Sequence, residues 1–108
     1  MTKRATESAI NAMVRLIVER FQPEQVILFG SHARGDAGPD SDVDLLVVMP
    51  VKGSRRAKQV EIRLALHDIH LPKDIIVSTP EEFAWRRNVV GAIEEPAVRE
   101  GKVLYARV

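Results

Sequence analysis

Apolar residues recur along the chain with two different spacings. Between Thr6 and Phe21 they fall three and four positions apart, which predicts one amphipathic helix that Pro23 ends. The same spacing predicts a second helix from about residue 54 to residue 70. Each predicted helix has one apolar side, as expected of a helix that covers a sheet.

Short continuous apolar runs predict the strands, because they are rich in β-branched and aromatic residues and are bounded by glycine or proline. These runs cover residues 26–29, 43–49, 74–77 and, near the end of the chain, 102–105. Between the first two runs, glycine and proline favour turns, with room for a short helical turn around Ala33.

The segment after the third strand predicts a helix over residues 80–100. The run Thr-Pro-Glu-Glu from Thr79 is a capping-box pattern with proline at the first helical position. Gly91 and Pro96 interrupt the helix, which suggests two pieces. Trp85 has two readings: it completes a small core, or with the two arginines that follow it forms a partner-binding patch.

Alternating helices and strands indicate an α/β (α+β) fold with a small mixed sheet flanked by helices. The 108 residues suffice for one domain, so we expect a single domain over residues 1–108. Strand order and direction cannot be derived from the pattern.

Composition excludes several classes of function. Sixteen basic residues against fifteen acidic ones give a net charge of +1, without the excess typical of a nucleic-acid binder. No apolar run approaches the ~20 residues of a membrane span, and the N-terminal residues lack a signal-peptide core, so we expect a cytoplasmic protein without a membrane partner. The absence of cysteine excludes thiolate nucleophiles and cysteine-ligated zinc.

The residues that suggest chemistry lie around the first two predicted strands. Gly30 and Ser31 follow a buried strand directly, where backbone N–H groups and a hydroxyl can donate to phosphate. Asp42 and Asp44 are two positions apart at the start of the next strand, so both carboxylates point to the same face. Asp74 occupies the same place in the third strand, where pairing with a neighbour would bring it beside them.

Carboxylate oxygens are hard ligands that suit Mg²⁺, which usually completes its coordination with water and substrate phosphates. Three such acids can hold two Mg²⁺ ions, one activating an attacking hydroxyl and the other balancing charge on a leaving pyrophosphate. The pattern therefore indicates nucleotidyl transfer.

The motif Gly30-Ser31, ten residues, then Asp42-x-Asp44 resembles the signature of the polymerase-beta-type nucleotidyltransferase superfamily, and most closely its minimal nucleotidyltransferase (MNT) branch. The resemblance implies a polymerase-beta-like nucleotidyltransferase fold. It also implies that Gly30 and Ser31 hold the terminal phosphates and that Asp42 and Asp44 bind both metals. Asp74 would complete the metal site or activate the acceptor hydroxyl. For Arg34 two readings stay open: it binds phosphate, or it pairs with a nearby acid.

The MNT branch is similar to antitoxins encoded with a HEPN-type RNase toxin. The resemblance implies transfer of AMP from ATP to a hydroxyl, that of a tyrosine, on such a toxin within a hetero-oligomer. Two alternatives stay open. One is a non-catalytic antitoxin or binding module that neutralises its partner by complex formation. The other is a nucleotidyltransferase that modifies a small-molecule hydroxyl, although the chain has little length left to enclose such an acceptor.

Overall fold

The computed structural model describes residues 2–107, and each expected strand forms there. The helices are α1 (Lys3–Phe21), α2 (Ser31–Arg34), α3 (Arg55–Ala65), α4 (Pro80–Arg86) and α5 (Glu94–Glu100). The strands are β1 (Gln25–Phe29), β2 (Val43–Val48), β3 (Lys73–Ser78) and β4 (Lys102–Ala106). The short helical turn around Ala33 is α2, and its N–H bonds return to the carbonyl of Gly30.

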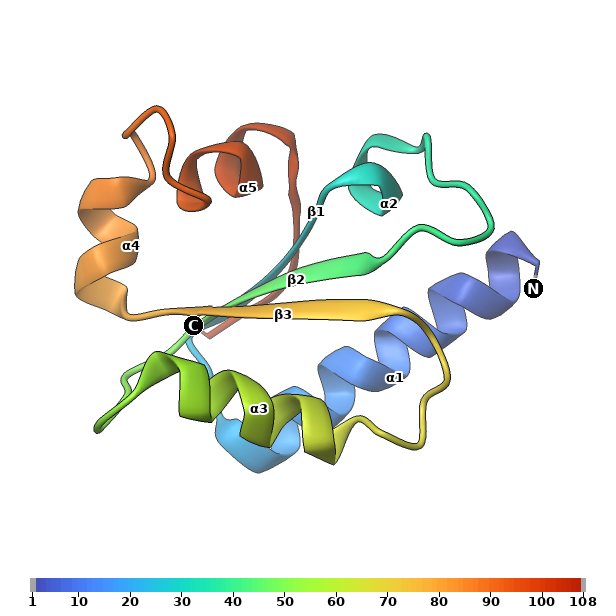
Figure 1. The fold of residues 1–108 in the computed structure, drawn as a ribbon, viewed down its shortest axis with the longest axis horizontal. Helices are drawn as coiled ribbons and strands as arrows, with labels where there is room; N and C mark the ends of the chain where they lie inside the picture. The colour runs from blue at the N-terminus through green and yellow to red at the C-terminus, as the bar shows by residue number, and fades with distance from the viewer. Residues whose placement is uncertain (1, 108) are drawn as a thin grey trace.

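The four strands form one mixed sheet in the order β3-β2-β1-β4. β1 pairs antiparallel with both β2 and β4, whereas β2 and β3 run parallel. Successive side chains on each strand alternate between two apolar layers. One layer packs against α1 and α3, and the other lies under α4 and α5, so helices cover both faces (Figure 1). The predicted class, a mixed sheet flanked by helices, is confirmed.

The predicted ends of two helices were wrong. α1 starts at Lys3 rather than Thr6, because the Thr2 hydroxyl accepts a hydrogen bond from the N–H of Ala5 at 3.0 Å and caps the helix earlier. α3 ends at Ala65 rather than near residue 70. Leu66 and the partly buried apolar residues after it still pack into the α1/α3 layer, so their spacing continues a helical pattern that the backbone has left.

The expected helix over residues 80–100 forms as two pieces, but the break lies before Pro96. α4 begins where the Thr79 hydroxyl accepts from the N–H of Glu82, and it ends at Arg86. Turns containing Gly91 (φ +98°) follow. Pro96 falls in the first turn of α5, where an N–H has no partner within the helix, so proline is tolerated. Within residues 2–107, no helix combines the length and apolar character of a membrane span.

Trp85 does not complete a core. Its side chain is 61% exposed, whereas Phe83 on the same helix is buried against the α4/α5 face of the sheet. The reading of Trp85 as a core residue was therefore wrong. The arginine that follows it is committed to ion pairs within the chain, with Glu82 and Glu94.

Candidate active site

The turn after β1 brings the backbone against a carboxylate of β2. Gly30 has φ +75°, a backbone conformation that residues with a side chain rarely adopt. A Cβ atom built on Gly30 would overlap Oδ2 of Asp44. Glycine is therefore required here twice, for the turn and for the close approach of Asp44.

Strand pairing aligns two of the predicted acids. Asp44 faces Phe29 in the β1/β2 register and Asp74 in the parallel β2/β3 register. The neighbours of Asp44 and Asp74 along their strands point into the α1/α3 layer. Because successive side chains of a strand point to opposite faces, Asp44 and Asp74 point to the face that carries α4 and α5. Asp42 lies just before β2, two positions from Asp44. The sequence prediction that a neighbouring strand places Asp74 beside Asp44 is confirmed at the level of register.

Asp44 has an unfavourable electrostatic environment. Partial burial raises the pKa of its carboxyl, and the negative charges of Asp74 and then Asp42 raise it further. His32 and Arg34 act in the opposite direction, but the net shift of the pKa is upward. Asp44 is therefore a carboxylate whose charge is poorly balanced by the protein alone, and hard carboxylate donors of this kind suit a divalent cation.

Asp74 has a counter-ion that the sequence did not suggest. The guanidinium of Arg63, on α3, donates from Nη2 to Oδ1 of Asp74 at 3.4 Å, and both side chains are about half exposed. Among residues 2–107, no three acidic, histidine or cysteine side chains converge closely enough to enclose a metal ion. Asp42 and Asp74 thus both lie near Asp44, but among residues 2–107 the three carboxylates do not form a closed cage.

Arg34 pairs with acids of the chain itself. Its Nε lies 3.2 Å from the carboxylate of Asp36, and its Nη1 lies 3.8 Å from that of Glu100 on α5. These contacts agree with the reading of Arg34 as the partner of a nearby acid. His32 has no role in the sequence prediction. Its Nε2 lies 3.1 Å from the carbonyl oxygen of Ser41 and so ties α2 to the residue before Asp42.

A groove of about 600 Å³ lies beside this loop, between the start of α1, residues 35–41 and the start of β4. Leu28 and Leu104, which line it, pack in the α1/α3 layer, so the groove is on the opposite side of the sheet from Asp44 and Asp74. None of the acids Asp42, Asp44 and Asp74 lines the groove.

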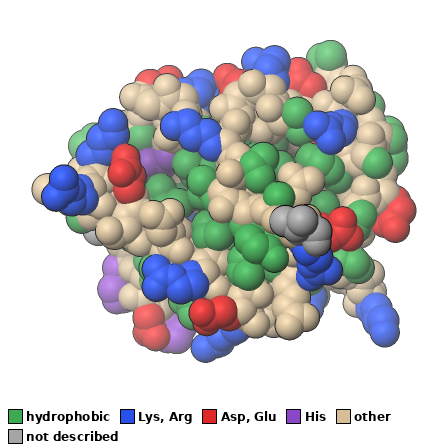
Figure 2. Space-filling view, turned by 180° about the vertical axis from the view of Figure 1, so that it is seen from behind, with side chains coloured by type: hydrophobic (Ala, Val, Ile, Leu, Met, Phe, Trp, Pro, Cys, Tyr) green, Lys and Arg blue, Asp and Glu red, His purple; other side chains and the backbone are tan. Residues whose placement is uncertain are grey.

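The face seen in Figure 2 carries hydrophobic side chains near its middle, with Lys and Arg interspersed among Asp and Glu around them.

Residues 10–99 match the sequence profile of the nucleotidyltransferase domain family. The chain belongs to this family. Over 47 residues it is 43% identical to the protein adenylyltransferase MntA of Thermococcus cleftensis, covering 44% of this chain and 48% of that protein. Over 101 residues it is 29% identical to a Methanocaldococcus jannaschii protein provisionally named as a protein adenylyltransferase, covering 92% and 97%.

The chain spans about half the length of the first relatives it matches, 48% of the Thermococcus protein and 54% of a second Methanocaldococcus protein. The fold also matches solved structures. One is the complex of a tri-AMPylated Shewanella oneidensis HEPN toxin with its MNT antitoxin, with a TM-score of 0.62 and 17% identity. That match covers 94% of this chain and 72% of the other. At this identity the likeness concerns the fold.

Proposed function

We propose that this protein is a Mg²⁺-dependent nucleotidyltransferase that transfers AMP from ATP to a hydroxyl, that of a tyrosine, on a HEPN-type RNase toxin. It would act as the antitoxin in a hetero-oligomer with that toxin. The observation that carries the proposal is the contact between the Gly30 turn and Asp44, with Asp74 in register beside them, in a chain of the nucleotidyltransferase family. ATP is available in the cytoplasm, where we place the protein as a single-domain enzyme.

Each site residue has a part in this reaction. Gly30 and Ser31 would bind the terminal phosphates through backbone N–H groups and the Ser31 hydroxyl. Asp42 and Asp44 would hold the cation, and Asp74 would join them or accept the proton of the acceptor hydroxyl. Mg²⁺, when bound, supplies charge for the leaving pyrophosphate and lowers the pKa of the attacking hydroxyl. The hydroxyl oxygen bonds to the α-phosphorus as the bond to the β-phosphate breaks.

The relatives support the choice of nucleotide and acceptor. All three relatives named above are called protein adenylyltransferases, two of them provisionally, and one fold neighbour is a toxin–antitoxin structure with AMP-PNP. The near-neutral net charge of +1 favours a protein acceptor over nucleic acid. We assign Arg34 a minor role in nucleotide binding, because two carboxylates already engage its guanidinium.

The test is incubation of the chain with α-labelled ATP, Mg²⁺ and a candidate HEPN-type toxin. We expect label on the toxin, and Asp42→Asn or Asp44→Asn should reduce labelling by about a hundredfold or more, since each removes a metal ligand. Asp40→Asn is the matched control, because Asp40 is an exposed acid of the same loop. If the toxin acquires no label in a metal-dependent way, the proposal is refuted.

Other outcomes of the same experiment identify the alternatives. If Asp42→Asn abolished labelling but left toxin neutralisation intact, complex formation rather than transfer would be the antitoxin mechanism. If label entered only the small-molecule fraction of a cell extract, the acceptor would be a small-molecule hydroxyl.

A further inference from the structure

The ion pair between Arg63 and Asp74 crosses the edge of the sheet. α3 packs in the α1/α3 layer through Ile62, whereas Asp74 points to the other face. β3 is an edge strand, so the guanidinium reaches Asp74 by passing around that open edge. Arg63 is therefore a residue from one side of the sheet that acts on a carboxylate on the other.

The three acids differ in how their charges are balanced. Asp74 has the guanidinium of Arg63 at 3.4 Å. Within residues 2–107, neither Asp42 nor Asp44 makes an ion pair, and Asp44 is the carboxylate that lies against the Gly30 turn. A cation that approached Asp74 would have to displace a positive group already in contact with it. A cation that approached Asp42 and Asp44 would meet no such competitor.

We infer that Arg63 is a positioning residue that competes with a second divalent cation for Asp74, so that the nucleotide-free chain has one strong cation site rather than two. This inference rests on the proposed function only in taking Asp42 and Asp44 as the strong site. Removing the positive charge of Arg63 should strengthen the second, weaker site. Repulsion between a divalent cation and a guanidinium ~6 Å away in a water-like dielectric corresponds to about a tenfold change in affinity.

The test is a Mn²⁺ titration of the nucleotide-free protein, with free Mn²⁺ followed by electron paramagnetic resonance. In the wild type we expect one strong site and one weaker site. Arg63→Gln should raise the affinity of the weaker site about tenfold, and Arg63→Lys, which keeps the charge, should restore the wild-type curve. Arg56→Gln is the matched control. It removes the same charge from the same helix, and among residues 2–107 Arg56 makes no ion pair.

The remaining outcomes separate this inference from the proposed function. Two equal Mn²⁺ sites in the wild type, or the same curve for Arg63→Gln and Arg56→Gln, would overturn the role of Arg63. An unchanged strong site in Asp44→Asn would instead overturn the metal site of the proposed function. Thermal unfolding checks that the variants fold, and we expect little change because the Arg63–Asp74 ion pair is exposed.

Discussion

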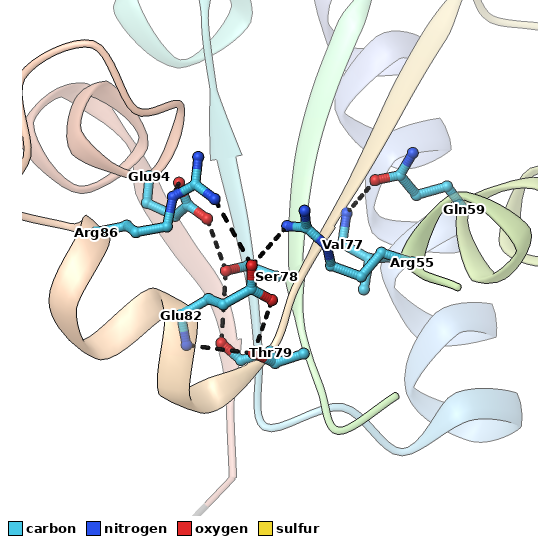
Figure 3. A network of polar contacts seen from close by, with 8 residues as sticks. All are labelled: Arg55, Gln59, Val77, Ser78, Thr79, Glu82, Arg86 and Glu94. Atoms are coloured by element: carbon cyan, nitrogen blue, oxygen red, sulfur yellow. Dashed lines mark hydrogen bonds and ion pairs between the residues drawn. The ribbon is translucent and has the colours of Figure 1, made fainter. Parts of the chain in front are cut away.

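A buried carboxylate anchors the α4–α5 segment to the sheet, and its two polar contacts predict unequal effects of mutation. The side chain of Glu94 is 1% exposed. It accepts a hydrogen bond from the Ser78 hydroxyl at 2.8 Å, and its other oxygen lies 3.3 Å from Nε of Arg86. Arg86 is 30% exposed and also pairs with Glu82, which in turn binds Arg55 of α3 (Figure 3). Within the described chain, Glu94 Oε1 has no hydrogen bond of good geometry.

Arg86→Gln should destabilise the fold more than Glu94→Gln. Without Arg86, the Glu94 carboxylate stays buried with only the Ser78 hydroxyl, and an uncompensated buried charge of this kind costs about 3–5 kcal/mol. Glu94→Gln keeps the side-chain volume and the bond from Ser78, and it leaves Arg86 partly in solvent beside Glu82. Its cost is the ion pair with Arg86 and the negative charge on the acceptor of the Ser78 hydrogen bond, together about 1–2 kcal/mol.

Urea unfolding followed by far-UV circular dichroism measures both free energies of unfolding. The double variant Arg86→Gln/Glu94→Gln should be less destabilised than the sum of the single variants, because it leaves no buried charge. Arg99→Gln, which breaks an exposed i,i+4 pair with Glu95, is the control and should change stability by less than about 0.5 kcal/mol. Equal losses for Arg86→Gln and Glu94→Gln would refute the argument from burial.

Two further predictions concern the site. Gly30→Ala should lower stability by about 1–3 kcal/mol and abolish labelling of the toxin, because the added Cβ atom displaces the Asp44 carboxylate. Gly53→Ala is the control and should keep the activity, because Gly53 also has a positive φ (+95°) but lies in open space. Equal activity of these two alanine variants would contradict the first prediction. Asp44→Asn should stabilise the cation-free protein at pH 7. The pKa of the Asp44 carboxyl is raised in the folded protein, so this group contributes stability below its unfolded pKa near 3.8. That stability is lost as the pH rises through the folded pKa, and asparagine, which carries no charge, avoids the loss. Thermal unfolding at pH 7 and pH 3 should show the gain only at pH 7, and a gain at both would contradict it.

The strands could be predicted because their apolar runs are buried on both faces, as in the β2 residues that supply both core layers. The order of the strands in the sheet could not be predicted, because β1 and β4, which pair with each other, are separated by most of the chain. Helix ends were missed where apolar residues continue past the helix, as at Leu66. The break between α4 and α5 was expected from both Gly91 and Pro96, but only the glycine lies in it, since the first turn of a helix accepts proline.

The candidate site divides in the same way. Gly30, Ser31, Asp42 and Asp44 were predicted because they lie within one loop and its two strands. Arg63 is eleven residues from Asp74 and reaches it only because α3 packs next to an edge strand, so no local pattern indicated it. The tie from His32 to Ser41 was missed because a histidine next to a carbonyl has no sequence signature.

The uneven charge balance of the chain bears on whether the site is active or only a relic. At one end of β3, the charges of Glu82, Arg86 and Glu94 alternate and compensate one another. At the other end, Asp44 and Asp74 face each other across the ladder, and the pKa of Asp44 is raised. A binding module that acted by shape alone would gain stability from replacing Asp44 with a neutral residue and would lose nothing. If Asp44→Asn is more stable and also fails to label the toxin, the unbalanced carboxylates are explained by a bound cation and by transfer.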